Sequence, residues 1–381
     1  MPTATNDRPR ERLVVQTAFL GDVLLSLPLI RAIKREWPDD RLVVLVRRGV
    51  GSYLRDSGLV DEVVEVEKSA SSSWRTAKAA LRSREFELVV CPHESFRSAL
   101  FVSGLTAKKK VGFERFFNSF AFDLRLVRPL TLPESLRQLS LVRTEIASIG
   151  PLIDDFEKSQ GAAGGQGPRK GELIAPSMQL EMRVPKLTSI RAAFESGGDW
   201  QSLLSTGAQR MADDLAVGKK PLVVLAPGSV WKTKMWTTEG FVDVAKSWIS
   251  RGAKVAIFGS PDEAPLADEI ARLSGATSIA GKTSLFESAE LLALAELLVC
   301  NDSGAMHLGA TAGTPTVGIF GPTILEFGYR PWNPRASVVQ IDLDCRPCGK
   351  HGAKKCPLGT HACMKGISAK AVLSAADDLP R

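Results

Sequence analysis

The chain has 381 residues, and its 49 lysines and arginines exceed its 42 aspartates and glutamates by seven. Hydrophobic residues make up 44% and charged residues 24%, which excludes a disordered or collagen-like protein and allows two or three domains with cores of their own. No apolar run approaches the ~20 residues that span a bilayer, and the polar segment 1–12 holds no apolar signal core, so we expect a soluble, cytoplasmic protein.

Two series of short apolar runs alternate with helical patterns along the chain. The first series predicts strands and helices at 12–16, 22–36, 42–46, 62–66, 87–91 and 136–149, and its last helix is expected to stop at Gly150–Pro151. A Gly-rich stretch at 159–170 is typical of a linker, and one helix is expected at 200–215. The second series predicts strands and helices at 222–226, 238–250, 254–258, 263–273, 285–296, 297–300, 304–312, 316–320 and 368–379. Such alternation predicts two α/β domains with parallel sheets, and ligands of such sheets bind beyond the carboxyl ends of the strands.

The first chemical signal is Leu20-Gly21-Asp22, which follows the first predicted strand. Gly21 permits a tight turn, and Asp22 would lie at a helix start that faces the predicted site. One interpretation is an N-cap, which aspartate favours, and the other is a general base.

Two further segments follow strands of the second series. The segment 226–236 combines a Gly-Ser turn at Gly228-Ser229 with Lys232 and Lys234, which suits a phosphate group, although a surface loop with packed tryptophans is the alternative. The segment 300–308 contains Asn301-Asp302-Ser303-Gly304 at a helix start, where free N–H groups attract anions. His307 lies one turn further, as a ligand candidate or a structural histidine.

Two other motifs fail on spacing. Lys282 follows Gly281 as in a phosphate-binding P-loop, but the first glycine of that motif is replaced by Ala276. Gly49 and Gly51 lack the third glycine of a dinucleotide-binding fingerprint.

In this order and spacing, the segments 19–25, 227–234, 301–307 and 313–315 resemble glycosyltransferase family 9, the ADP-heptose:lipopolysaccharide heptosyltransferases. The resemblance implies GT-B architecture, with two Rossmann-like domains facing across a cleft. It assigns 1–155 to an acceptor-binding domain, 156–218 to a linker and insertion, 219–366 to a nucleotide-sugar-binding domain and 367–381 to a C-terminal helix. Its departures from the family pattern are Met235 and Thr237, beside Trp236.

The resemblance also implies an inverting transfer of heptose from ADP-heptose to an inner-core sugar of lipopolysaccharide, with a Kdo/heptose–lipid A acceptor. Asp22 would be the general base, and no cofactor would be required. The donor would be held by residues of the second domain, namely Ser229, Lys234, Glu263, Asp302, Ser303, Gly304 and His307. The enzyme would work in the cytoplasm or peripherally at the inner membrane, touching that surface transiently. The alternative is a related glycosyltransferase with another nucleotide-sugar donor or a non-lipopolysaccharide acceptor.

Four cysteines near the C-terminus have spacings close to those of zinc sites: Cys345, Cys348, Cys356 and Cys363. A structural zinc is one interpretation, and reduced thiols in a loop are the other. In the first domain, the run at 108–110 with Arg115 suits an anionic acceptor or is a solvated face, and Phe116, Phe117 and Phe120 either pack or rest on a membrane.

Two other functional classes of protein are less consistent with these motifs. A nucleic-acid-binding protein would use the basic charge and the cysteines, yet would leave Asp22 and the 302–307 segment unexplained, so we expect no nucleic-acid partner. A sugar-nucleotide binder without catalysis would keep the second-domain motifs and dispense with Asp22.

Overall fold

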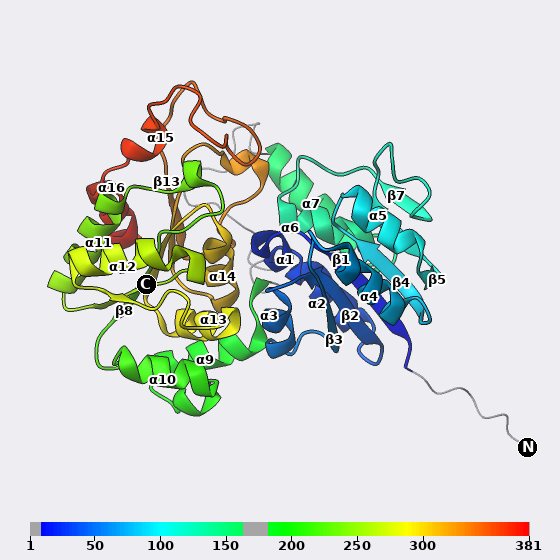
Figure 1. Cartoon of the computed structure of the whole chain (residues 1–381), viewed down its shortest axis with the longest axis horizontal. Coiled ribbons are helices and arrows are strands. Elements are labelled where there is room, and N and C mark those ends of the chain that lie inside the picture. The colour runs from blue at the N-terminus through cyan, green and yellow to red at the C-terminus, as the bar shows by residue number, and fades with distance from the viewer. Residues whose placement is uncertain (1–8, 163–181, 381) are drawn as a thin grey trace, which may run out of the picture. The chain divides into compact units, whose positions relative to one another are not determined.

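The structure, a computed structural model, describes residues 9–162 and 182–380 (Figure 1). The chain divides into two compact units, one up to Gly164 and one from Gly165 onwards, and each is described by itself. Most of the Gly-rich linker predicted at 159–170 lies outside the described residues, as does much of the predicted insertion.

The first unit is built on a parallel sheet whose described strands number seven. The strand order is β3-β2-β1-β4-β6-β7, and β5 pairs with β4. The strands are β1 Glu11–Gln16, β2 Arg41–Arg47, β3 Glu62–Val66, β4 Glu85–Cys91, β5 Thr106–Ala107, β6 Lys110–Phe113 and β7 Leu124–Leu126. Strands β1 to β4 were predicted from their apolar runs, whereas β5, β6 and β7 contain no continuous apolar run.

Helices connect these strands: α1 Leu20–Leu24, α2 Leu27–Glu36, α3 Gly51–Asp56, α4 Ser71–Leu81, α5 Phe96–Ser103, α6 Glu134–Leu139, η1 Ser140–Val142 and α7 Ile149–Ala162. The single helix predicted at 22–36 is broken between α1 and α2. Pro28 lies in the first turn of α2, where its missing N–H costs no intrahelical bond.

The stop signal predicted at Gly150–Pro151 is wrong in its position. The pattern at 136–149 forms α6 and η1 and ends before Gly150. Helix α7 starts at Ile149 and continues through Pro151, because proline is accepted in the first helical turn.

The second unit has a parallel sheet whose described strands number six, in the order β10-β9-β8-β11-β12-β13. Its strands are β8 Leu222–Ala226, β9 Lys254–Ile257, β10 Thr277–Ser278, β11 Leu297–Asn301, β12 Thr316–Ile319 and β13 Ala336–Val339. Since all the pairings are parallel, the carboxyl ends of β8 and β11 meet at one edge, with Ala226 opposite Cys300. The two neighbouring segments predicted to bind phosphate therefore start side by side.

The helices of this unit are α9 Pro185–Glu195, η2 Gln201–Leu203, α10 Thr206–Asp214, η3 Lys232–Lys234, α11 Thr238–Ser250, η4 Pro261–Glu263, α12 Ala264–Ser274, α13 Leu285–Leu294, α14 Gly304–Ala312, η5 Leu325–Phe327, α15 Ala362–Lys365 and α16 Ala369–Asp377. The helix predicted at 200–215 is split, because Ser205 caps α10 through its side chain.

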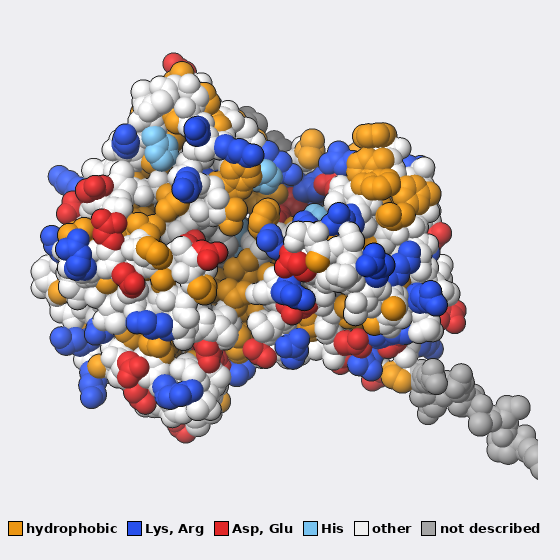
Figure 2. Space-filling view, viewed as in Figure 1, with side chains coloured by type: hydrophobic (Ala, Val, Ile, Leu, Met, Phe, Trp, Pro, Cys, Tyr) orange, Lys and Arg blue, Asp and Glu red, His pale blue; other side chains and the backbone are white. Residues whose placement is uncertain are grey.

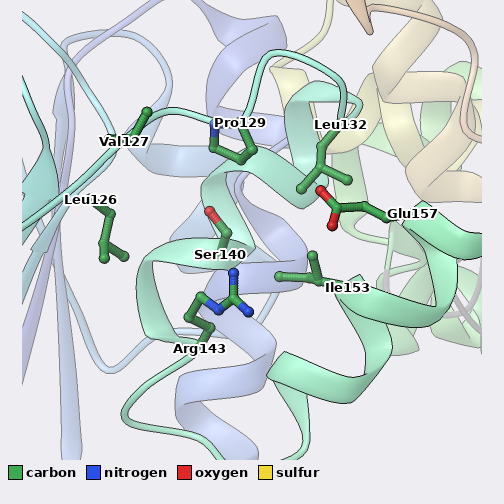
Figure 3. A pocket seen from close by; sticks show the side chains of 8 residues that line it. All are labelled: Leu126, Val127, Pro129, Leu132, Ser140, Arg143, Ile153 and Glu157. Atoms are coloured by element: carbon green, nitrogen blue, oxygen red, sulfur yellow. The ribbon is translucent and has the colours of Figure 1, made fainter.

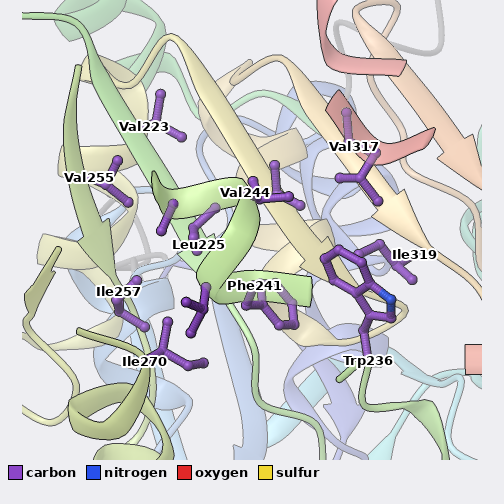
Figure 4. Close-up of a cluster of buried hydrophobic side chains, with 14 of the residues drawn as sticks. Val223, Leu225, Trp236, Phe241, Val244, Val255, Ile257, Ile270, Val317 and Ile319 are labelled. Atoms are coloured by element: carbon purple, nitrogen blue, oxygen red, sulfur yellow. The ribbon is translucent and has the colours of Figure 1, made fainter. Parts of the chain in front are cut away.

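One face of this sheet packs on α11, α12 and α16 through a cluster of buried apolar side chains (Figure 4). Trp236 and Phe241 lie edge to face in this cluster, with ring centroids 5.1 Å apart. Trp236 also donates from Nε1 to the carbonyl of Ile367 at 3.0 Å, which ties the chain before α11 to the chain before α16. No helix in the described parts of the chain is long and apolar enough to cross a bilayer.

Candidate functional site

A buried asparagine at the carboxyl end of β11 fastens the segment that follows β8. The side-chain nitrogen of Asn301 donates to the carbonyl of Pro227 at 2.7 Å, and its oxygen accepts from the backbone N–H of Trp236 at 2.9 Å. Asn301 is fully buried, so neither partner has water as a substitute. One side chain thus fixes both ends of the predicted phosphate-binding segment.

The next residue, Asp302, receives two hydrogen bonds from segments far away in the sequence. Lys234 Nζ and Thr323 Oγ1 each donate to Asp302 Oδ2, both at 2.6 Å. The side chains of Lys234 and Asp302 are 11% and 5% exposed, so the ion pair is largely removed from water. A pair this buried needs good geometry to offset its desolvation. The contact therefore fixes a lysine ammonium at the carboxyl edge of the second sheet.

Helix α14 begins immediately after this pair. Ser303 is its N-cap, and its side chain makes no capping hydrogen bond, so the first-turn N–H groups are left without that acceptor. Ser303 and Gly304 are both half-buried. The free N–H groups and the helix dipole make this end attractive to an anion.

His307, one turn into α14, is only 3% exposed. Burial lowers its pKa to about 4, with the Lys234 charge acting in the same direction and Asp302 opposing it. Among the described residues, His307 Nδ1 has no hydrogen-bond partner. A buried neutral imidazole with an unsatisfied nitrogen is unusual in a purely structural role, because such a group normally finds a partner.

Glu263 and Ser229 follow two neighbouring strands of the second sheet. Ser229 follows β8, and Glu263 ends η4, which follows β9. Glu263 Oε2 accepts from the backbone N–H of Ser260 at 2.8 Å, which caps the start of η4. Its carboxylate lies against Gly228, where an added Cβ would be 2.0 Å from Oε1. Ser229, half-buried, follows directly and accepts from the backbone N–H of Trp231 at 3.4 Å. The structure thus brings Glu263 to the Gly-Ser turn, 35 residues away in the sequence.

In the first unit, Asp22 lies in the first turn of α1, just after β1, and is half-buried. The N-cap of α1 is Phe19, so Asp22 is not the capping residue considered as an alternative. Gln138 Nε2 donates to the backbone carbonyl of Asp22 at 3.3 Å. The Asp22 carboxylate interacts with the Lys68 ammonium and favours its charged form. Burial and the charge of Arg47 outweigh this effect and lower the pKa of Lys68 below its usual value.

A buried polar network extends from Gln138 to the ends of β4 and β7. Gln16 donates to Gln138, which donates to Glu134, at 3.0 Å and 3.2 Å. Arg128 bridges the carboxylates of Glu134 and Glu94. Sequence reasoning assigned no role to these residues, because nothing in their spacing indicates that the strand ends bring them together. They support the backbone at Asp22.

All four C-terminal cysteines are free thiols, and within residues 9–162 and 182–380 no three His, Cys, Asp or Glu side chains are grouped to hold a metal ion. The proposed zinc therefore gains no support from their arrangement. Backbone N–H groups donate to the Cys356 sulfur, with that of His361 having the largest effect, and they lower the pKa of the Cys356 thiol. Burial raises the pKa of the Cys363 thiol.

The cysteine loop nevertheless contacts the Lys234 segment. Thr233 Oγ1 donates to the carbonyl of Ala353 at 2.6 Å, and His361 Nε2 lies 2.7 Å from the Thr233 carbonyl. Trp231 stacks on His351 with ring centroids 5.7 Å apart. These contacts pack the cysteine loop against the 226–236 segment.

A cavity of about 240 Å³ lies elsewhere in the first unit (Figure 3). Its lining is mostly apolar and comes from the end of β7, the segment between β7 and α6, the region of η1, and α7: Leu126, Val127, Pro129, Leu132, Ser140, Arg143, Ile153 and Glu157. None of the predicted site residues lines it.

Comparison with known proteins shows what the chain is similar to. A family model described as glycosyltransferase family 9 (heptosyltransferase) matches residues 189–358. The lipopolysaccharide heptosyltransferase 3 of Escherichia coli is 25% identical over 327 residues, which cover 83% of this chain and 84% of that protein. The second unit of the chain is therefore similar to glycosyltransferase family 9, and the likeness to the E. coli protein extends over most of the chain.

Other relatives match this chain over a shorter span. The lipooligosaccharide heptosyltransferase 2 of Campylobacter jejuni is 35% identical over 169 residues, or 42% of the chain. The match covers about half (51%) of that relative's length.

A solved structure has a similar fold over most of the chain. The structure described as E. coli ADP-heptose lps heptosyltransferase II superimposes with a TM-score of 0.70 at 20% identity, covering 96% of this chain and 97% of that one. The predicted fold class, an α/β protein of GT-B architecture with two Rossmann-like parts, is confirmed.

Proposed function

We propose that the protein is an inverting heptosyltransferase that moves a heptose from ADP-heptose to an inner-core sugar of lipopolysaccharide. The observation that carries the proposal is the anion site of the second unit. There, the Lys234 ammonium, the start of α14 and the unsatisfied His307 Nδ1 come together around Asp302. The relatives' names, heptosyltransferases of lipopolysaccharide or lipooligosaccharide, supply the sugar and the acceptor.

The donor diphosphate would bind at this site. Lys234 supplies a positive charge, and the Ser229 and Ser303 hydroxyls with the first N–H groups of α14 donate hydrogen bonds. Asp302 and His307 would contact the heptose, and Glu263, beside the Gly228 turn, the ribose. Donors placed in advance around the diphosphate stabilise the negative charge that develops on ADP as it leaves, so the reaction as proposed requires no cofactor.

Asp22 would act as the general base. It would take the proton of the acceptor hydroxyl while the oxygen of that hydroxyl forms a bond to the anomeric carbon of heptose. The bond from that carbon to the ADP oxygen breaks, ADP leaves with the electron pair, and attack from the opposite side inverts the anomeric centre. The network of Gln138 and Glu134 holds the backbone that carries Asp22.

The acceptor would be the Kdo/heptose region of a lipid A-anchored core, and the protein would therefore work at the cytoplasmic face of the inner membrane. A second candidate is a related transferase that uses another nucleotide sugar or a non-lipopolysaccharide acceptor. The two departures Met235 and Thr237, beside Trp236, favour keeping this candidate, since they neighbour Lys234.

The test compares Asp22→Asn and Asp22→Ala with the native protein. We expect transfer to fall by about 10²–10⁴-fold, the usual contribution of a positioned base. ADP affinity, measured by calorimetry, should stay within about twofold, since the proposal places no donor contact on Asp22. Asp56→Asn, which changes an exposed carboxylate of the same unit, is the matched control. Full activity of the Asp22 variants would remove Asp22 from the mechanism.

A further inference from the structure

An exposed apolar surface covers α5 and the segment that connects β6 to β7. It consists of five side chains, here called the aromatic patch: Phe96, Leu100, Phe116, Phe117 and Phe120. Phe116 is 96% exposed, and Phe96, Leu100 and Phe120 are each at least half exposed. Figure 2 shows it as the orange area at the upper right of the view. Isolated exposed apolar residues are ordinary, whereas a contiguous group marks an interaction surface.

The members of the patch contact one another. The ring of Phe96 lies edge to face with those of Phe117 and Phe120, with centroids 6.0 Å and 6.2 Å apart. Phe116 meets Phe117 in the same way at 5.1 Å. Leu100 lies one helical turn from Phe96 on α5. The rings therefore form one surface from two separate segments.

The loop that presents Phe116 is held in place by buried groups. Asn118, 2% exposed, donates from its side chain to the carbonyl of Phe113 at 2.8 Å and accepts from the N–H of Arg115 at 3.0 Å. Phe122 packs against Gly112, where an added Cβ would meet its ring at 2.6 Å. The exposure of Phe116 is thus fixed by the fold beneath it.

Exposed basic residues adjoin the patch in the sequence, since Arg97 follows Phe96 and Arg115 precedes Phe116. The segment 94–130 carries seven Lys and Arg against three Asp and Glu, a net charge of +4 out of +7 for the whole chain. Lys108 and Arg115 keep their side chains 61% and 47% exposed while pairing with Glu87 and Glu94. An apolar surface with a positive rim is complementary to an anionic bilayer, whose interface accepts aromatic rings and attracts cations.

We propose that the aromatic patch is the surface by which this protein docks on anionic membrane lipids. The proposal rests on the proposed function, since a lipid-anchored acceptor requires work at a bilayer. Phe116 and its neighbours enter the headgroup region, and the exposed basic side chains of Arg97, Lys108 and Arg115 contact lipid phosphates. The docking places the acceptor-binding unit, which carries Asp22, at the membrane.

The test is co-flotation of the full-length protein with vesicles. Phosphatidylethanolamine vesicles that contain phosphatidylglycerol should carry the protein, and phosphatidylcholine vesicles should carry much less. Raising the salt concentration should weaken the binding, because screening acts on the basic rim. The variant Phe116→Ser/Phe120→Ser should bind the vesicles at least about tenfold more weakly than the native protein, because the rings supply the apolar part of the binding.

Leu273→Ser changes a side chain of α12 that is 40% exposed, and this control should bind as the native protein does. Unchanged melting temperatures check that the exposed substitutions leave the fold intact. Native-like flotation of the Phe116→Ser/Phe120→Ser variant, or no flotation of the native protein, would overturn the proposal. So would self-association of the native protein that the variant abolishes, since the patch would then bind a second copy.

The transfer assay separates this proposal from the function on which it rests. With a water-soluble acceptor saccharide that lacks lipid A, the native protein and the patch variant should transfer heptose equally well. Absence of transfer by both, with flotation lost only in the variant, would refute the function and leave the docking surface supported.

Discussion

Replacing Lys234 by methionine tests the role of the buried ion pair. The change keeps the side-chain length and removes the ammonium that lies 2.6 Å from Asp302 Oδ2. Asp302, 5% exposed, then retains the hydrogen bond from Thr323 as compensation for its charge. A buried carboxylate that has lost its cation is the most costly outcome of breaking such a pair.

The expected loss in the free energy of unfolding is about 3–4 kcal/mol, the lower part of the range for removing one partner of a buried pair, because Thr323 remains. The double variant Lys234→Met/Asp302→Asn removes both charges and should lose only about 1–2 kcal/mol. The double variant should therefore be about 2 kcal/mol more stable than Lys234→Met, although it carries one more substitution. With the single variant Asp302→Asn as the third variant, the loss of the double variant minus the two single losses gives the coupling free energy, which should be about 2 kcal/mol or more in magnitude. Chemical denaturation of the native protein and the three variants measures it.

ADP binding separates function from stability in the same four proteins. We expect both variants that lack Lys234 to lose ADP affinity about tenfold or more, although the double variant is nearly as stable as the native protein. Lys246→Met, which changes an exposed lysine of α11 in the same unit, is the matched control and should change neither quantity. Native ADP affinity in the double variant, or a coupling free energy near zero, would refute the reasoning.

Two further predictions concern neighbouring groups. Because burial lowers the pKa of His307 to about 4, against about 6.5 for an unfolded histidine, the unfolded state binds the extra proton first as the pH falls. The free energy of unfolding should therefore decrease from pH 6.5 towards pH 4, and this residue should contribute about 3 kcal/mol of that decrease. Chemical denaturation of His307→Gln over the same pH range should show a smaller decrease. A decrease equal to that of the native protein would contradict the burial of a neutral His307. Glu263→Ala should cost about 0.5–2 kcal/mol as the η4 cap is lost. Gly228→Ala should destabilise the native protein, because its Cβ would displace the Glu263 carboxylate, and should add little further loss to Glu263→Ala; an equal loss from Gly228→Ala in both backgrounds would contradict the contact.

The strands and helices that carry the site were predictable from local patterns. The apolar runs at β8 and β11 were long enough to identify, and parallel pairing then required their carboxyl ends to meet at one edge. The helix at 304–312 agrees with α14 at both ends. The break at Pro28 and the course of α7 through Pro151 were missed, since proline in a first turn and proline after a helix look alike in sequence.

The side-chain contacts were not predictable. Lys234 and Asp302 are 68 residues apart, and their pairing depends on how η3 lies over the end of β11. The sequence presented Asn301 only as the neighbour of Asp302, although its side chain fixes both ends of the 226–236 segment. For the aromatic patch, sequence alone could not separate packing from exposure, because the loop between β6 and β7 has no regular period.

Acceptor-dependent release of ADP from ADP-heptose is the measurement that tests the central claim most directly. The purified protein is incubated with ADP-heptose and Kdo–lipid A, with and without a chelator, and with UDP- and GDP-sugars in parallel. We predict ADP release that requires the acceptor, persists with the chelator, and yields a product of inverted anomeric configuration. Release from UDP- or GDP-sugars instead, or none from ADP-heptose with any inner-core acceptor, would contradict the proposed function.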